Sequence, residues 1–108
     1  MRLYHNPRCS KSRQALSLMN ESGFVFEEYR YLDLGIHADD LEILSNLENV
    51  IRTGDLESNE SIDLSNKIRV ASLLKSDPRV LQRPILIRGE RAVIGRPPEE
   101  IITLLHEA

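Results

Sequence analysis

A short polar stretch between a hydrophobic segment and an amphipathic helix constrains this chain more than any other feature. The stretch reads H-N-P-R-C-S-K-S-R over residues 5–13 and contains Cys9, the only cysteine among 108 residues. Leu3 and Tyr4 lead into it, and apolar residues recur at helical spacing after it. The pattern predicts a strand, a turn, and then a helix whose first turn begins just after Cys9.

A cysteine at the start of a helix has a distinct chemistry. The first N–H groups of a helix have no partner within it, and the helix dipole adds partial positive charge there. This position stabilises a thiolate, which is the reactive form of cysteine, and the same N–H groups suit a tetrahedral oxyanion. Arg13 lies one turn into the helix, and His5 and Arg8 flank the loop. The alternative is that Cys9 is a small buried apolar residue. Its mostly polar neighbours make a poor core, so we favour a reactive cysteine.

Composition narrows the classes of protein to which the chain can belong. It is 41% hydrophobic and 29% charged, which predicts one globular domain with its own core. A net charge of −3 argues against a nucleic-acid or membrane-surface role, and we expect a monomer. The absence of a disulfide pair, a membrane-length apolar run and a signal pattern favours the cytoplasm. One cysteine and three scattered histidines lack zinc-site spacing, so we expect no bound metal or cofactor.

The rest of the chain divides into three parts by its periodicity. Strands are expected at residues 1–4, 24–32, 84–88 and 91–95, and a turn at 33–35. Helices are expected from Ser10 to a stop at Gly23, from Ala38 over Leu41, Leu44 and Leu47, over 62–75, and from Pro97-Pro98 onward. In the 62–75 helix, Leu64, Ile68, Ala71 and Leu74 are predicted to form the buried face, with Ser61 as a cap. A polar loop over 49–59 carries Arg52.

The order β-α-β, helical segment, β-β-α predicts an α/β fold of the thioredoxin-like type. A helix connects the first two strands, so they should be parallel, whereas Gly89-Glu90 predicts a tight antiparallel hairpin. The sheet should therefore be four-stranded and mixed. We expect a single domain over 1–108, with residues 1–33 and 79–108 as the core and 37–78 as an all-α insertion.

Three arginines occupy suggestive positions in this predicted fold. Arg83 precedes Pro84 and the third strand, Arg96 follows the fourth strand, and Arg52 lies in the polar loop. If the third strand pairs with the first, Arg83 comes near the Cys9 loop. A guanidinium binds oxyanions through several fixed donors. The sequence leaves two alternatives open here: these arginines could serve only as surface charge, and the bond before Pro84 could be cis or trans.

Five spaced motifs in the chain resemble the glutaredoxin-linked arsenate reductase family. They are residues 5–13, Tyr31-Leu32, Ile51-Arg52-Thr53, Gln82-Arg83-Pro84-Ile85, and Ile94-Gly95-Arg96-Pro97-Pro98-Glu99. The resemblance extends over nearly the whole chain and implies a thioredoxin fold with a helical insertion. It implies that Cys9 is catalytic, that Arg52, Arg83 and Arg96 bind the substrate, and that His5 supports the thiolate. We add Arg13 to this supporting role because of its place in the helix.

The resemblance implies reduction of arsenate, or a related oxyanion, to arsenite through a covalent arseno-cysteine on Cys9. Glutathione would be the reductant and a glutaredoxin the protein partner. Ser10-Lys11 follows Cys9 where established members have Gly-Thr, similar to a branch related to the Spx-type regulators. Two alternatives are a glutathione-linked thiol redox protein with another substrate, and a non-enzymatic Spx-like module that binds RNA polymerase. Spx-type proteins typically carry Cys-x-x-Cys, but Ser12 stands at the second position here and excludes an internal disulfide.

Overall fold

The computed structural model describes residues 1–55 and 63–106 and contains one mixed sheet. Its strand order is β2-β1-β3-β4. The strands are β1 (Arg2–Tyr4), β2 (Glu27–Tyr29), β3 (Ile85–Arg88) and β4 (Arg91–Ile94). β1 pairs parallel to β2 and antiparallel to β3, and β3 pairs antiparallel to β4. The predicted four-stranded mixed sheet is confirmed.

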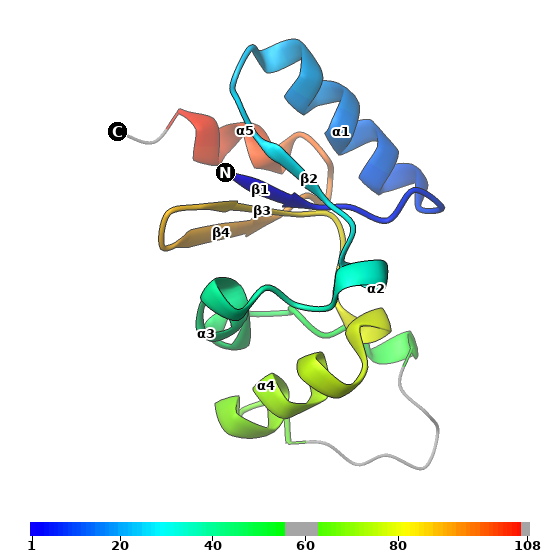
Figure 1. Ribbon diagram of the computed structural model, residues 1–108, viewed down its shortest axis with the longest axis vertical. Helices are drawn as coiled ribbons and strands as arrows, with labels where there is room; N and C mark the ends of the chain where they lie inside the picture. The colour runs from blue at the N-terminus through cyan, green and yellow to red at the C-terminus, as the bar shows by residue number, and fades with distance from the viewer. Residues whose placement is uncertain (56–62, 107–108) are drawn as a thin grey trace.

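Helices cover both faces of the sheet (Figure 1). On one side lie α1 (Ser10–Ser22) and α5 (Glu100–Leu105), and on the other lie α2 (Tyr31–Leu34), α3 (Leu41–Asn46) and α4 (Lys67–Ser76). The described residues also form short 3₁₀ turns, which are η1 (Ala38–Asp40), η2 (Thr53–Asp55) and η3 (Pro78–Val80). Within the described ranges, no helix has the length and apolar character needed to cross a bilayer.

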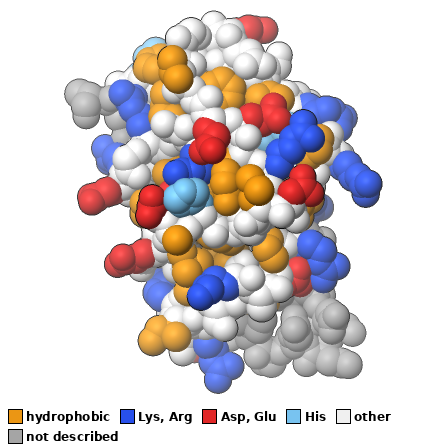
Figure 2. All heavy atoms as spheres, viewed as in Figure 1, with side chains coloured by type: hydrophobic (Ala, Val, Ile, Leu, Met, Phe, Trp, Pro, Cys, Tyr) orange, Lys and Arg blue, Asp and Glu red, His pale blue; other side chains and the backbone are white. Residues whose placement is uncertain are grey.

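Each face of the sheet has its own hydrophobic core because successive side chains of a strand point to opposite faces. Leu3 and Leu86 pack with the residues of α1 and α5. Tyr4, Ile85 and Ile87 pack with the segments between the two halves of the fold. The helical segment therefore forms one wall of the protein's core. Figure 2 shows acidic and basic side chains interspersed over one face of the molecule.

The predicted second strand is wrong at both ends. Only Glu27–Tyr29 form β2, and Val25 is 90% exposed. The residues after Arg30 turn into α2, closed by a hydrogen bond from Gly35 N to Tyr31 O, where the sequence predicted a strand end and a turn. The reason lies in pairing. Among the described residues, β2 is an edge strand that pairs only with β1, which is three residues long. Aromatic and branched residues beyond that length have no described strand to pair with.

The predicted 62–75 helix is correct in type and in the burial of Leu74, but wrong in its start and in the rest of its buried face. The helix begins at Lys67, and Asn66 caps it by accepting from Ile68 N at 3.1 Å. The proposed cap, Ser61, lies outside the described residues. Ile68 is 83% exposed, whereas Val70 and Leu74 are buried. Residues two positions apart in a helix point about 200° apart around its axis. Because Val70 faces the core, Ile68 points toward solvent.

Two other helices start later than predicted. The segment expected to be helical from Ala38 begins as the 3₁₀ turn η1 and becomes α-helical at Leu41. The last helix begins at Glu100, two residues after the Pro97-Pro98 pair. Short 3₁₀ turns at helix starts are common because the first N–H groups have no α-helical partner.

A buried polar network joins β1 to the helical segment. The Tyr4 hydroxyl donates to Asp40 Oδ2 at 2.8 Å and accepts from His37 N at 3.1 Å. Arg2 Nη1 lies 3.4 Å from the same carboxylate oxygen, and Asp40 is 2% exposed. Burial raises the pKa of Tyr4 far above its ordinary value, which keeps the hydroxyl a neutral donor. A buried carboxylate is tolerated only when it is paired in this way.

We expect Tyr4→Phe to lower the free energy of unfolding by about 1–3 kcal/mol, because buried polar groups of Asp40 and His37 would lose their partner. Urea unfolding measured by circular dichroism checks this. Tyr29→Phe is the matched control: its hydroxyl donates to Gly35 O in a more accessible place, so the expected loss is about 0.5–1.5 kcal/mol. Equal losses in the two variants would contradict a special role for the network.

Candidate functional site

Cys9 occupies the N-cap position of α1, as the sequence predicted. Its backbone is extended, its carbonyl accepts from Arg13 N at 3.0 Å, and its own N–H donates to Asn6 O at 3.0 Å. The thiol is partly buried. Within the described residues, the Cys9 side chain closes no cap hydrogen bond, but the N–H groups of Lys11 and Ser12 at the start of α1 lie close enough to the sulfur to lower its pKa. The loop therefore places the sulfur against the unpaired donors of a helix start.

A buried contact between Ser12 and His5 stabilises the Cys9 loop. Ser12 is fully buried, and its hydroxyl oxygen lies 2.9 Å from His5 Nδ1 and accepts from Asn6 N at 2.9 Å. Burial is the largest influence on His5 and lowers its pKa, which favours the neutral ring. Sequence reasoning treated Ser12 only as the place of a missing cysteine. The missed signal was a small hydroxyl residue three positions after the N-cap, on the inner face of α1.

His5 and Arg13, the two residues predicted to support the thiolate, both contact the Cys9 loop in the part of the chain that the structure describes. Arg13 Nη1 donates to Pro7 O at 3.0 Å, and His5 contacts Ser12 as above. Both contacts stabilise the backbone that carries Cys9. A direct effect of these two residues on the thiolate stays a prediction.

Arg83 and Arg96 both reach the sulfur. The guanidinium of Arg83 donates a hydrogen bond to the Cys9 side chain. Arg96 Nη2 lies 3.9 Å from Cys9 Sγ. Arg96 Nε also donates to Arg83 O at 2.9 Å, which ties the two residues together. Each of them directly precedes a cis proline, Pro84 or Pro97, so the alternative left open for Pro84 is decided.

Gly95 allows the two arginine-bearing segments to approach. Its N–H donates to Pro84 O at 2.8 Å. A Cβ atom at this position would lie 2.8 Å from Pro84 Cγ, closer than real Cβ contacts. A larger residue would push the end of β4 away from Pro84 and move Arg96 with it.

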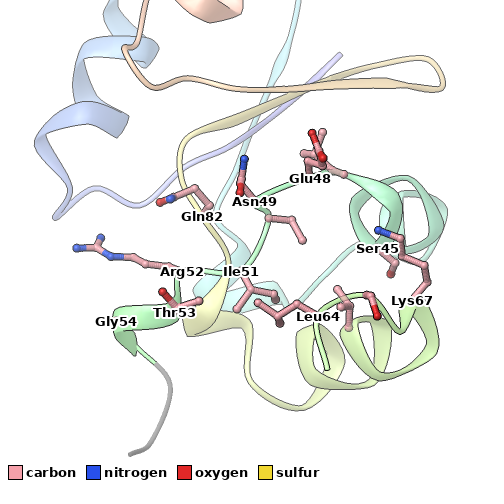
Figure 3. Close-up of a pocket in the computed structure, with 14 residues that line it drawn as sticks. Ser45, Glu48, Asn49, Ile51, Arg52, Thr53, Gly54, Leu64, Lys67 and Gln82 are labelled. Atoms are coloured by element: carbon pink, nitrogen blue, oxygen red, sulfur yellow. The ribbon is translucent and has the colours of Figure 1, made fainter. Parts of the chain in front are cut away.

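The helical segment brings Arg52 to the end of the sheet where Arg83 and Arg96 lie. Ile51 forms an isolated antiparallel bridge with Leu81, supported by bonds from Arg52 N to Val80 O and from Gln82 N to Val50 O, each 2.7 Å. Figure 3 shows the Arg52 side chain directed toward the side on which the loop after β1 lies. The structure thus brings Arg83 and Arg96 to Cys9 and places Arg52 on the segment paired beside them.

The electrostatic balance at the sulfur favours the thiolate. Burial by itself raises the pKa of Cys9, but the nearby N–H groups of Ser12 and Lys11 and the Arg83 guanidinium outweigh it and lower the pKa below its ordinary value. In the described ranges, no group of three or more His, Cys, Asp or Glu side chains is placed to hold a metal ion. A thiolate beside two guanidinium groups can attack an electrophilic centre that carries oxyanion oxygens.

A profile of the ArsC family matches residues 4–104. The chain belongs to the ArsC family. It is 35% identical over 114 residues to an arsenate reductase of Haemophilus influenzae, covering 95% of this chain and 97% of that protein. It is 29% identical to the global transcriptional regulator Spx of Streptococcus mutans, covering 95% of this chain and 81% of that protein. An arsenate reductase structure from Vibrio cholerae superposes with a TM-score of 0.73 at 26% identity, covering 95% of this chain and 97% of that one.

For this ArsC-family protein, we expect the Cys9 thiol to titrate below the free value of roughly 8.5. Arg83→Ala should raise the midpoint because it removes a cation and a donor that favour the thiolate. Thiolate absorbance against pH measures both. Arg79→Ala is the control, since Arg79 pairs with Asp77 on an exposed surface. A midpoint at or above the free value, or equal midpoints in the two variants, would remove the argument for an activated thiol.

Proposed function

We propose that this protein reduces arsenate, or a related oxyanion, to arsenite through a covalent intermediate on Cys9. The single observation that carries the proposal is the contact of Arg83 and Arg96 with a sulfur whose pKa is lowered. Similarity to an arsenate reductase over almost the full length of both chains supports the choice of substrate.

Binding comes first in this scheme. Arsenate is a tetrahedral anion, and two guanidinium groups offset its charge and donate to its oxygens in fixed directions. The same groups bring a negatively charged nucleophile close to a negatively charged substrate, which would otherwise be repelled. Arg52, on the paired segment beside Arg83, is proposed as the third substrate-binding arginine.

The chemistry then needs two thiols. The Cys9 thiolate attacks arsenic, a sulfur–arsenic bond forms, and one arsenate oxygen leaves as water after protonation. Glutathione displaces a second oxygen in the same way. Collapse of this adduct joins the two sulfurs as a mixed disulfide, and arsenic(V) takes the electron pair to become arsenite. A glutaredoxin, using glutathione, then returns Cys9 to the thiol.

A second candidate function rests on the similarity to Spx. In this reading the protein binds a partner and does no chemistry. The lowered pKa of Cys9 and the two arginines at its sulfur favour an enzyme, because a docking surface needs neither. A glutathione-linked thiol enzyme acting on a different substrate would use the same cysteine, so arsenate reduction itself is the discriminating measurement.

Arg83→Ala and Arg96→Ala should each lower kcat/KM for arsenate by about 10- to 100-fold, the usual effect of losing a hydrogen bond to a charged group. A coupled assay with arsenate, glutathione and glutaredoxin measures this, and circular dichroism verifies the fold. Arg79→Ala is the control. Arg88 is unsuitable as a control because its Nη1 donates to Leu104 O and Leu105 O at the end of α5. If Arg79→Ala behaves like the other two variants, the arginines form no site.

The missing second cysteine predicts which reductant works. Ser12 occupies the place of a resolving cysteine, and a hydroxyl cannot carry out thiol–disulfide exchange. Oxidised Cys9 must therefore resolve through an external thiol. We expect turnover with glutathione plus glutaredoxin, little turnover with thioredoxin alone, and a glutathione adduct on Cys9 by intact mass. Equal turnover with thioredoxin alone and no adduct under any condition would overturn the scheme.

A further inference from the structure

β4 leaves one edge of the sheet open. Among the described residues it has a strand on one side only, and none of its residues is buried, whereas most of β3 is. An outer strand presents backbone N–H and C=O groups that can pair with another chain. The other outer strand, β2, is protected by charge, since Glu27 and Glu28 form ion pairs with Arg2 and Arg30. β4 is apolar after Arg91, so it is the more accessible edge.

The hydrogen-bond pattern decides which groups of β4 face outward. Gly95 N donates to Pro84 O at 2.8 Å, so Gly95 directs its N–H toward the segment that leads into β3. Bonded and non-bonded positions alternate along an antiparallel ladder, and the register makes Val93 the next residue of β4 that bonds to β3. Ala92 and Ile94 therefore turn their N–H groups away from β3, where an incoming strand can reach them.

A groove of about 540 Å³ borders this edge, between α3 and the β3–β4 hairpin, and is called the β4 groove below. Figure 1 shows α3 lying below the hairpin. Ile43, Leu47 and Ala92 line the groove and also pack against the core behind it, which gives it an apolar floor. Since successive side chains of a strand alternate between faces, a strand added to β4 would direct every second side chain toward this groove.

The charged side chains that line the β4 groove are all acidic: Asp39, Glu42 and Glu90. Asp39 Oδ2 lies 3.8 Å from His37 Nδ1, whereas Glu42 and Glu90 form no ion pair in the part of the chain that the structure describes. Arg91, which precedes a groove-lining residue of β4, points to the opposite face. A complementary partner carries Lys or Arg, whose aliphatic stems can pack on the apolar floor while their charges reach the carboxylates.

We propose that β4 binds an extended, basic segment of another protein as an added strand of the sheet. The segment pairs with the outward N–H groups of Ala92 and Ile94, and a Lys or Arg at every second position faces the carboxylates of the β4 groove. Charge argues against a second copy of this chain as the occupant, because it would bring the same carboxylates to an already acidic groove. The inference goes beyond the proposed function and does not depend on it.

The test uses a fluorescein-labelled peptide, Gly-Lys-Val-Arg-Val-Lys-Gly, titrated into the full chain and followed by fluorescence anisotropy and NMR. We expect saturable binding at low ionic strength and no binding of a peptide with Glu in place of Lys and Arg. Amide hydrogen exchange at Ala92 and Ile94 should slow when the peptide binds. Exchange at Val93 should change little, because its N–H already bonds to β3.

Matched variants separate the two parts of the proposal. Glu42→Gln and Glu90→Gln should each raise Kd by about two- to fivefold, the usual effect of losing an exposed charge pair. Glu21→Gln, exposed on α1 across the sheet, should leave Kd unchanged. Two further peptides carry N-methyl groups either at their valines or at their basic residues. Only one of these two sets of N–H groups can face β4, so only one of the peptides should lose binding.

Three results would overturn the proposal: no saturable binding, the same Kd in all three Glu→Gln variants, or equal binding by the two N-methylated peptides. A fourth is slow exchange at Ala92 without peptide that depends on protein concentration, because it would show that a second copy occupies the edge. None of these measurements involves arsenate, so the result stands whether or not the protein reduces it.

Discussion

The antiparallel pairing of β1 with β3 is the constraint on which the site depends. Tyr4, the last residue of β1, lies opposite Ile85, the first residue of β3. The loop to Cys9 therefore starts at the same end of the sheet as Arg83 and Pro84, which precede β3. β4 pairs antiparallel to β3 with Ile94 opposite Ile85, and therefore ends at this edge as well. Strand pairing therefore brings the Cys9 loop and the two ends of the β3–β4 hairpin, which lie far from that loop in the sequence, to one place.

The sulfur is held in a balance of opposing effects. Partial burial disfavours the thiolate, while N–H groups of α1 and the Arg83 guanidinium favour it and prevail. That balance depends on the position of the loop, which the buried Ser12–His5 pair maintains from beneath. A neutral His5 suits this role because the pair needs a hydrogen bond and no further charge.

The helical segment is attached to the sheet at both of its ends. It supplies one wall of the core against Tyr4 and Ile85, and the Tyr4–Asp40 bond fixes its first turn to β1. At its other end, the bridge from Ile51 to Leu81 carries Arg52 alongside the residues leading to Arg83.

The sequence by itself determined the elements whose signals are local. The polar stretch around Cys9, the stop at Gly23 and the hairpin at Gly89 predicted a strand, a helix and a β-turn from neighbouring residues alone. The order of these elements was enough to predict a four-stranded mixed sheet and to bring Arg83 near Cys9. Motifs spaced along the chain were enough to suggest the family.

Only the tertiary structure decided the features that depend on distant partners. The length of β2 follows from its three-residue neighbour β1, and the exposure of Ile68 follows from which side of α4 meets the core. The loop-holding role of Ser12 and the unpaired oxygen of Gln82 are properties of burial. Burial and pairing are set by residues far away in the chain, and no local pattern in the sequence encodes them.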